Sequence, residues 1–169
     1  MPGLLDKLQG GDRRSIGRSE EVVSDVLAEP ELFSELFEGM LGDDPLVRTR
    51  AADAVEKVTH EHPEYLQTYK ARILQHVAQM EQQEVRWHVA QMIPRLELSH
   101  EERLKAMQIL SFYLADQSKI VQTFSLQAMA DLTEQDPTLR QQVLSALETA
   151  FQSGSPAVRS RVRKLMAKI

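Results

Sequence analysis

Apolar side chains recur along the chain at steps of three and four residues, as in Leu66, Tyr69, Ile73, Val77 and Met80. This spacing places them on one face of an α-helix. Sustained two-residue alternation is missing, and so are Asn-Gly and Asp-Gly hairpin signals. The pattern therefore predicts an all-α chain, with helices over 19–28, 30–41, 45–59, 63–79, 83–97, 100–115, 118–134, 137–152 and 156–168.

Capping residues and prolines mark the helix boundaries. Asp44, Asp136 and Ser155 each precede a proline, and a capping oxygen followed by proline favours a first helical turn. Ser99, with a glutamate three residues on, has the capping-box pattern. Pro94 lies inside a predicted helix and should kink it. The connections are short, which predicts antiparallel helical hairpins.

A twelve-residue pattern occurs four times, beginning at Val47, Val85, Val121 and Val158. The copies are offset by 38, 36 and 37 residues. Positions one, nine and twelve are apolar in every copy, and positions five and eight are apolar except for Ser125. These positions share one face of a helix. A single hairpin cannot bury that face, whereas stacked hairpins can, so the repeat predicts a solenoid.

The segments 45–52 and 84–90 resemble second helices of HEAT repeats, and the resemblance spans about residues 30–169. The chain is similar to small bacterial HEAT-repeat proteins of unassigned function. The resemblance implies a right-handed α-α superhelix, a HEAT-like (armadillo-like) solenoid of about four helical hairpins plus an N-terminal helix. Residues 1–18 hold four of the seven glycines, so we expect a flexible N-terminal arm there and one solenoid domain over 19–169.

The resemblance also implies where a partner binds, because second helices line the concave side of a HEAT stack. Trp87, the only tryptophan, should be partly exposed there, and aromatic residues beside arginine commonly anchor interfaces. In the alternative, Trp87 and Phe124 pack between adjacent repeats. The candidate partner-binding residues are Arg50, Asp53, Lys57, Trp87, His88, Gln91, Arg95, Phe124, Gln127, Arg161 and Lys164.

Arg48, Arg86 and Arg159 share position two of the repeat, where the third copy has Gln122. Two roles are open to this column. It could form a ladder for an acidic partner or for phosphates. It could instead bond acids or carbonyls of the neighbouring repeat, and we favour this role because guanidinium groups suit partly buried pairing.

The net charge of −5 is unevenly distributed. Residues 20–44 hold nine acids and no Lys or Arg, whereas residues 154–169 hold five bases and no acid. We therefore expect one negative end and one positive end. The basic C-terminal segment is amphipathic and could contact nucleic acid or an anionic membrane. We favour a capping helix, which needs a polar outer face.

No catalytic, cofactor or metal site is predicted. The chain has no cysteine, no glycine-rich phosphate loop and no Gly-x-Ser-x-Gly motif. His60 and His62 lie two apart at a helix end, and residues at that spacing point to different sides, so we expect a solvated helix end there. Because no catalytic motif is evident, we expect that the protein is not an enzyme. No apolar run approaches the roughly 20 residues of a membrane span, and no secretory signal is evident, so we expect a cytoplasmic protein.

These features favour a protein-interaction module or scaffold that uses its concave face. The alternative is nucleic-acid binding, as in the HEAT-like DNA glycosylases, which use a basic groove. A groove of that kind could be formed by Trp87, Arg86, Arg95 and the basic tail. The acidic overall charge and Asp53 on the same wall argue against that alternative. A third possibility, a bilin lyase or lyase chaperone, is retained through the resemblance alone. The identity of the partner, the oligomeric state and the pathway stay open.

Overall fold

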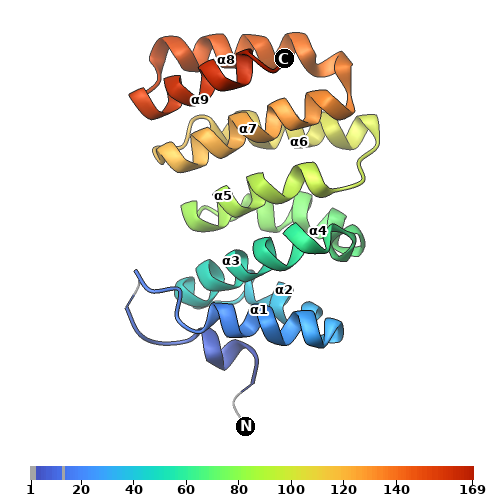
Figure 1. Ribbon diagram of the computed structural model, residues 1–169, viewed down its shortest axis with the longest axis vertical. Helices are drawn as coiled ribbons and strands as arrows, with labels where there is room; N and C mark the ends of the chain where they lie inside the picture. The colour runs from blue at the N-terminus through green and yellow to red at the C-terminus, as the bar shows by residue number, and fades with distance from the viewer. Residues whose placement is uncertain (1–2, 13) are drawn as a thin grey trace. The chain divides into compact units, whose positions relative to one another are not determined.

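The computed structural model describes residues 3–12 and 14–169 of the chain. In that part of the chain, all regular secondary structure is α-helix or short 3-10 helix, with no strand, as the hydrophobic pattern predicts (Figure 1). The chain divides into two compact units, the first ending at Met92 and the second running from Ile93 to Ile169. The expected single domain and the right-handed superhelix stay predictions.

Unit one is built around α3. This helix packs against α1 and α2 on one side and against α5 on the other. Buried valines and alanines of α3, such as Val55 and Ala51, supply the centre of the packing. The elements are η1 (Leu5–Leu8), α1 (Ser19–Ala28), η2 (Pro30–Leu32), α2 (Phe33–Gly39), α3 (Pro45–Glu61), η3 (Pro63–Tyr69), α4 (Lys70–Gln75), η4 (Val77–Gln79) and α5 (Gln83–Met92).

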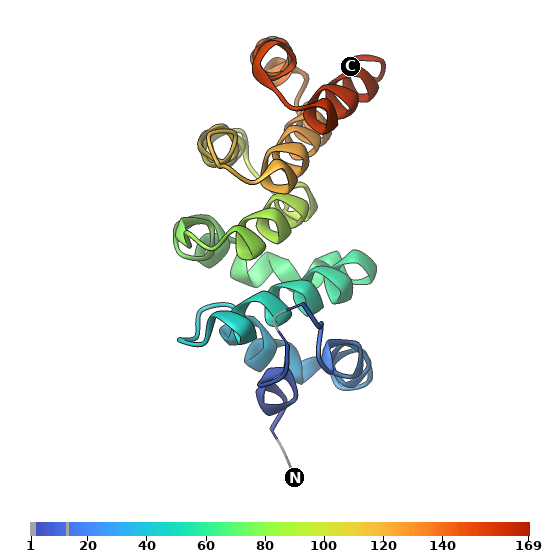
Figure 2. The same cartoon turned by 90° about the vertical axis from the view of Figure 1, so that its left-hand side faces the viewer.

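Unit two is built in the same way around α7, which packs against α6, α8 and α9. Within this unit, α7 and α9 lie side by side in one layer, and α6 and α8 form the other layer (Figure 2). The elements are η5 (Ile93–Arg95), α6 (His100–Tyr113), α7 (Lys119–Gln135), η6 (Pro137–Leu139), α8 (Arg140–Ser153) and α9 (Pro156–Met166).

The predicted caps form. The Asp44 side chain accepts a hydrogen bond from the Leu46 amide at 2.8 Å, and Ser99 makes a full capping box at the start of α6. The helix that contains Pro94 ends earlier than predicted. The regular α5 stops at Met92 and a 3-10 turn follows, because proline has no amide hydrogen for the next α-helical bond.

The apolar repeat positions lie in the two cores. The four valines at position one are all buried. The exception at position five, Ser125, is also fully buried, and its hydroxyl donates to the Val121 carbonyl at 2.7 Å, so it needs no outside partner. Met166, at position nine of the fourth copy, differs from its equivalents because it is 37% exposed.

The N-terminal segment packs on unit one. It contains a short 3-10 turn, η1, with Leu4 and Leu8 buried. The first α-helix begins at Ser19, where the sequence places the start of the folded body. The flexibility expected of residues 1–18 stays a prediction.

Candidate functional site

Three of the predicted residues in unit one meet around the carboxylate of Asp53. Lys57 Nζ lies 2.9 Å from Asp53 Oδ2. Ser19, buried at the start of α1, donates from Oγ to the same oxygen at 3.4 Å. Lys57 also donates to the carboxylate of Glu20, and His88 Nε2 lies 3.7 Å from Asp53 Oδ1. We call these five residues the Asp53 cluster; it brings together α1, α3 and α5.

Trp87 joins this cluster through His88. Its Nε1 donates to His88 Nε2 at 3.2 Å. His88 Nδ1 lies 2.5 Å from the Glu84 carbonyl, so Nδ1 carries the hydrogen while Nε2 accepts. His88 is buried and Trp87 is half-buried, which leaves part of the indole exposed beside the cluster, as the sequence predicts. Gln91, one turn further along α5, is also half-buried.

The cluster stabilises the charged forms of Asp53 and Lys57. Burial alone would raise the pKa of the Asp53 carboxyl, but pairing with His88 and Lys57 outweighs burial and holds that pKa below its usual value. Lys57 is the closer partner, because His88 Nε2 accepts from Trp87 and lies beyond hydrogen-bonding distance of Asp53. Burial would lower the pKa of Lys57, but Glu20 and Asp53 together raise it.

Arg50 is placed differently from the other predicted residues. It is only 2% exposed and is the largest fully buried side chain described. Four of its five N–H groups donate to backbone carbonyls of one segment, with distances of 2.8 Å to Leu8, 2.6 Å to Gly10, 3.0 Å to Asp12 and 3.1 Å to Ser15. We call residues 8–12 and 14–17 the strap. The strap covers Arg50. The sequence predicts that this residue is exposed on the face of the second helices, and that prediction is wrong because the strap buries it.

The strap is held mainly by these bonds. Its side chains from Gln9 to Gly17, where described, are all exposed, so they add little apolar burial. A hydrogen bond to a charged group contributes about 1.5–3 kcal/mol, and four give about 6–12 kcal/mol. Fixing the backbone of the eight described residues from Gln9 to Gly17 costs about 8–16 kcal/mol. Because the two terms nearly cancel, the strap belongs to the least stable part of unit one.

In unit two, three predicted residues form a contact between α7 and α9. The Arg161 guanidinium lies 6.0 Å from the centroid of the Phe124 ring, and its Nη1 donates to Gln127 Oε1 at 2.8 Å. Gln127 in turn donates to Asp131 Oδ1 at 2.9 Å. Phe124 and Arg161 are half-buried, whereas Lys164 is exposed. This face of α7 and α9 is therefore an aromatic and charged surface of its own.

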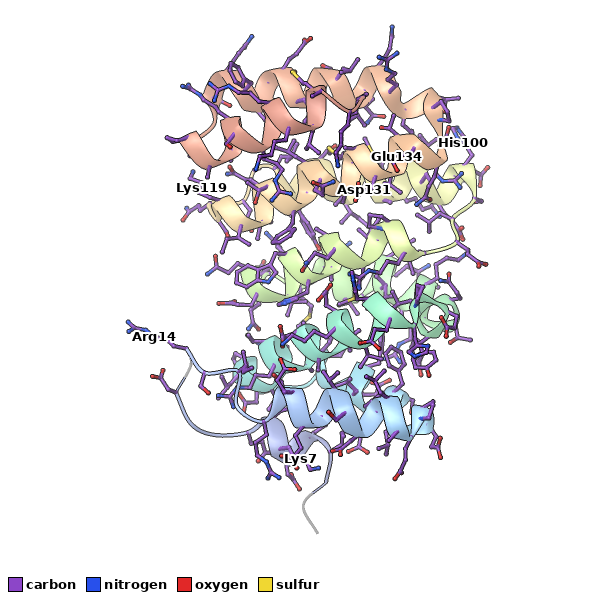
Figure 3. The ribbon with its side chains drawn as sticks, in the orientation of Figure 1. Lys7, Arg14, His100, Lys119, Asp131 and Glu134 are labelled. Atoms are coloured by element: carbon purple, nitrogen blue, oxygen red, sulfur yellow. The ribbon has the colours of Figure 1, made fainter. Side chains whose placement is uncertain are left out.

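Arg95 and Trp87 belong to different helices. The sequence places both on one continuous helix, but Arg95 belongs to η5 of unit two and Trp87 to α5 of unit one. The acids of the second face were not predicted. Asp131 and Glu134 lie on the side of α7 that faces the viewer in Figure 3. Asp131 occupies the repeat position held by Lys57 and Arg95, and that correspondence could have identified it.

Comparison with protein families matches the HEAT repeat domain over residues 8–169. The chain belongs to the HEAT repeat family. The match includes residues 8–18 of the predicted arm and extends through both units. No curated protein matches the chain. HEAT repeat domains generally mediate protein–protein interaction or scaffolding, so membership supports that broad function and confirms the HEAT-like α-solenoid class.

The arginine column of the HEAT repeats is structural, as favoured from the sequence. Arg48 donates to the carbonyls of Gly42 and Asp43, Arg86 to that of Met80, and Arg159 to those of Phe151 and Gln152. Each arginine thus binds carbonyls of the connection within its own hairpin. Arg48 also reaches the next repeat, because its Nε donates to Gln82 Oε1 at 2.9 Å. Gln122 keeps the same role, because its Nε2 donates to the Asp116 carbonyl at 2.6 Å.

The basic α9 also makes internal contacts. Arg159 and Arg163 lie 5.9 and 5.3 Å from the ring centroid of Phe151, and Arg161 binds α7 as described above. Three of the five bases in this segment therefore pack within unit two. Lys164 and Lys168 remain exposed.

No metal centre or membrane span is found in the described ranges. Within residues 3–12 and 14–169, no three His, Cys, Asp or Glu side chains are grouped so as to hold a metal ion. His62 Nδ1 pairs with Glu64 at 2.9 Å. No helix in this part of the chain has both the length and the apolar character needed to cross a membrane.

A cavity of about 400 Å³ between α6 and α8 was missed by sequence reasoning. Leu126 and Val158 lie at its floor, and small polar residues of α8, such as Ser145 and Thr149, line its side. Because these residues are short, they leave the space between the two helices unfilled. The repeat pattern could not show this cavity, since it records which residues are buried and not how well facing surfaces fit.

Proposed function

We propose that this protein is a non-enzymatic interaction module that binds a protein partner on the exposed faces of its second helices. The supporting observation is the half-buried Trp87 beside the Asp53 cluster in unit one. An aromatic side chain with an apolar ring and charged neighbours is a common anchor of an interface. HEAT repeat domains use such faces for binding.

Unit two offers a second face of the same kind. Phe124 lies under Arg161, and the exposed Lys164 and the half-buried Asp131 add opposite charges to this face. We propose that a partner contacts each face through aromatic and charged side chains. The chemistry required of the partner is mixed charge around apolar anchors, because neither face carries charge of a single sign.

The test uses a partner isolated from the host by crosslinking and then purified. Its affinity is measured by calorimetry for the unchanged chain, for Trp87→Ala and for Lys164→Glu. We expect Trp87→Ala to weaken binding by about tenfold or more, as for an interface anchor. Phe112→Ala is the control, because Phe112 is also an aromatic residue, 64% exposed, but lies on the first helix α6. Unchanged affinity in Trp87→Ala together with a loss in Phe112→Ala would contradict the proposed faces.

Nucleic-acid binding is the alternative, favoured by the exposed Lys164 and Lys168 of α9. The acids of the Asp53 cluster and the internal contacts of Arg159, Arg161 and Arg163 count against it. Titration with labelled duplex DNA at several salt concentrations separates the two functions. Affinity that falls steeply with salt would support DNA binding. A cytoplasmic location stays a prediction.

A further inference from the structure

Arg50 occupies a repeat position that belongs to the second-helix face in both copies of unit two. Position four of the repeat is Arg50, His88, Phe124 and Arg161 in the four copies. In the fourth copy the arginine is half-buried at the surface and binds the neutral side chain of Gln127. In the first copy the arginine is covered by the strap. The strap therefore lies where a partner would contact the second-helix face of unit one.

The backbone of the strap is shaped around the guanidinium. Gly10, Gly11 and Gly17 have φ values of 69°, 81° and 61°, which side chains other than glycine rarely adopt. A Cβ atom on Gly17 would lie 3.0 Å from the Arg50 Cζ and Nη1 atoms. The strap thus points several backbone carbonyls at the Arg50 guanidinium, and these carbonyls occupy the place of a ligand from another molecule.

Within residues 3–12 and 14–169, the guanidinium has no negative partner. Among the described residues, no carboxylate forms an ion pair with Arg50, and all of its hydrogen bonds go to neutral carbonyls. A carboxylate binds a guanidinium through two parallel, charge-assisted bonds, which are stronger than bonds to carbonyls. An acidic side chain is therefore a better ligand for Arg50 than the strap that now covers it.

The strap also carries charge that suits an acidic ligand. Arg14 is exposed and projects away from the body of unit one (Figure 3). Arg18 is exposed at the end of the strap, although it pairs with Glu21. An acidic segment would meet these cations before it reaches Arg50, whereas the acids of the Asp53 cluster limit how far along α3 it could extend.

We propose that Arg50 is a binding position for an aspartate- or glutamate-rich segment of a protein partner, and that this segment displaces the strap. The proposal rests on the proposed function, because it assigns a ligand class to one end of the unit-one face. The strap then acts as an internal competitor. Few contacts hold the strap, so displacing it costs little free energy. Exchange of its carbonyls for an acidic segment is therefore favoured, because the acidic segment is the stronger ligand for Arg50.

Two variants separate the strap from its arginine. Gly17→Ala places a Cβ against the guanidinium, so it loosens the strap and keeps Arg50. Arg50→Gln loosens the strap and removes the charge. Arg159→Gln is the matched control, because Arg159 also donates to backbone carbonyls but belongs to neither of the proposed binding faces. Circular dichroism checks that each variant is folded.

Strap opening is measured by the rate of tryptic cleavage after Arg14, and ligand binding by the fluorescence anisotropy of a labelled octaglutamate peptide. We expect Gly17→Ala to increase both the cleavage rate and the peptide affinity by about fivefold or more. Arg50→Gln should increase cleavage equally but bind the peptide more weakly than the unchanged chain does. Arg159→Gln should change neither measurement. Peptide binding by Arg50→Gln as tight as that by Gly17→Ala would overturn the proposal.

The unchanged chain gives an independent measurement, which keeps the test valid if a variant does not fold. Binding and strap opening are linked, so saturating octaglutamate should accelerate cleavage after Arg14 by about fivefold, while octaglutamine should not. Equal cleavage with both peptides would overturn the proposal. Because neither readout uses the native partner, this failure is distinct from failure of the proposed function, which the Trp87→Ala affinity decides.

Discussion

Lys57 Nζ lies 2.9 Å from Asp53 Oδ2, one turn away on the same helix. This ion pair differs from ordinary surface pairs because it is shared: Lys57 also binds Glu20, and Asp53 also accepts from Ser19, both on α1. The pair therefore fixes α1 against α3 as well as stabilising α3 itself. Removing either charge should affect the packing of two helices, which isolated surface pairs seldom do.

The Asp53 carboxylate should make stability depend on pH. Its pKa is lowered in the folded chain, so its contribution is fully present above the unfolded value of about 3.8 and is lost as the pH falls through the folded pKa. At pH 7 we expect Asp53→Asn to lower the free energy of unfolding by about 1–2 kcal/mol. Urea unfolding at neutral pH and at pH values below 4 measures the difference, which should shrink in acid.

Glu31→Gln is the control for this experiment, because Glu31 is exposed in η2 and is remote from the cluster in the chain. It should change stability by less than about 0.5 kcal/mol at any pH. A destabilisation by Asp53→Asn that is constant from neutral pH into acid would show that the ionised carboxylate is not what stabilises the packing.

Position two of the repeat offers a second test. Gln122→Ala removes the bond from Nε2 to the Asp116 carbonyl and should cost about 1 kcal/mol. Gln122→Arg should be close to neutral, because Arg86 and Arg159 make the equivalent bonds in their own hairpins. Thermal unfolding measures both variants. Gln141→Ala, on the exposed side of α8, is the control, and a loss there as large as in Gln122→Ala would exclude a specific role for the bond.

Much of this fold follows from local rules that a sequence displays. Asp44 and Ser99 sit at helix starts because a side-chain oxygen is the nearest acceptor for free amides, and both form the caps expected of them. The buried valine at position one recurs in all four copies because every hairpin must cover the same seam. Such features depend only on residues a few positions apart, so the pattern alone predicts them.

The candidate site depended on contacts that the pattern does not contain. Arg50 was predicted at the surface because its repeat position faces outward, but carbonyls about forty residues earlier in the chain bury it. The same limit applies to Ser19 and Glu20, which join the Asp53 cluster from another helix. Backbone carbonyls carry no sequence signal, although the glycines at residues 10, 11 and 17 indicate an unusual backbone there.

The core of unit two should be sensitive to loss of volume on α6. Leu110 is fully buried, and Leu110→Ala removes packed atoms and leaves a cavity, which should cost about 2–5 kcal/mol. Leu104→Ala changes the same residue type on the same helix where it is 41% exposed, and should cost less than about 1 kcal/mol. Guanidinium unfolding followed by circular dichroism compares them. Equal costs would mean that α6 does not pack on α7 as described.

Gly154 lies between α8 and α9, where the two helices approach too closely for a side chain. A Cβ atom there would lie 2.4 Å from the Ala150 carbonyl oxygen and 2.6 Å from Val158 Cγ1. Its φ of −80° is available to any residue, so the requirement for glycine comes from space and not from the backbone angle. We expect Gly154→Ala to cost about 1–3 kcal/mol, because one helix must shift.

Gly42→Ala is the matched comparison for Gly154→Ala, because it also lies between two helices of one unit but its nearest neighbour would be 3.8 Å from the new Cβ. Replacing an unconstrained glycine by alanine reduces the entropy of the unfolded chain, so Gly42→Ala should be neutral or stabilising by about 0.4–1 kcal/mol. Differential scanning calorimetry of both variants gives opposite signs if α8 and α9 are packed as described. If Gly154→Ala unfolds at the same temperature as Gly42→Ala, the close approach of Val158 to the end of α8 is wrong.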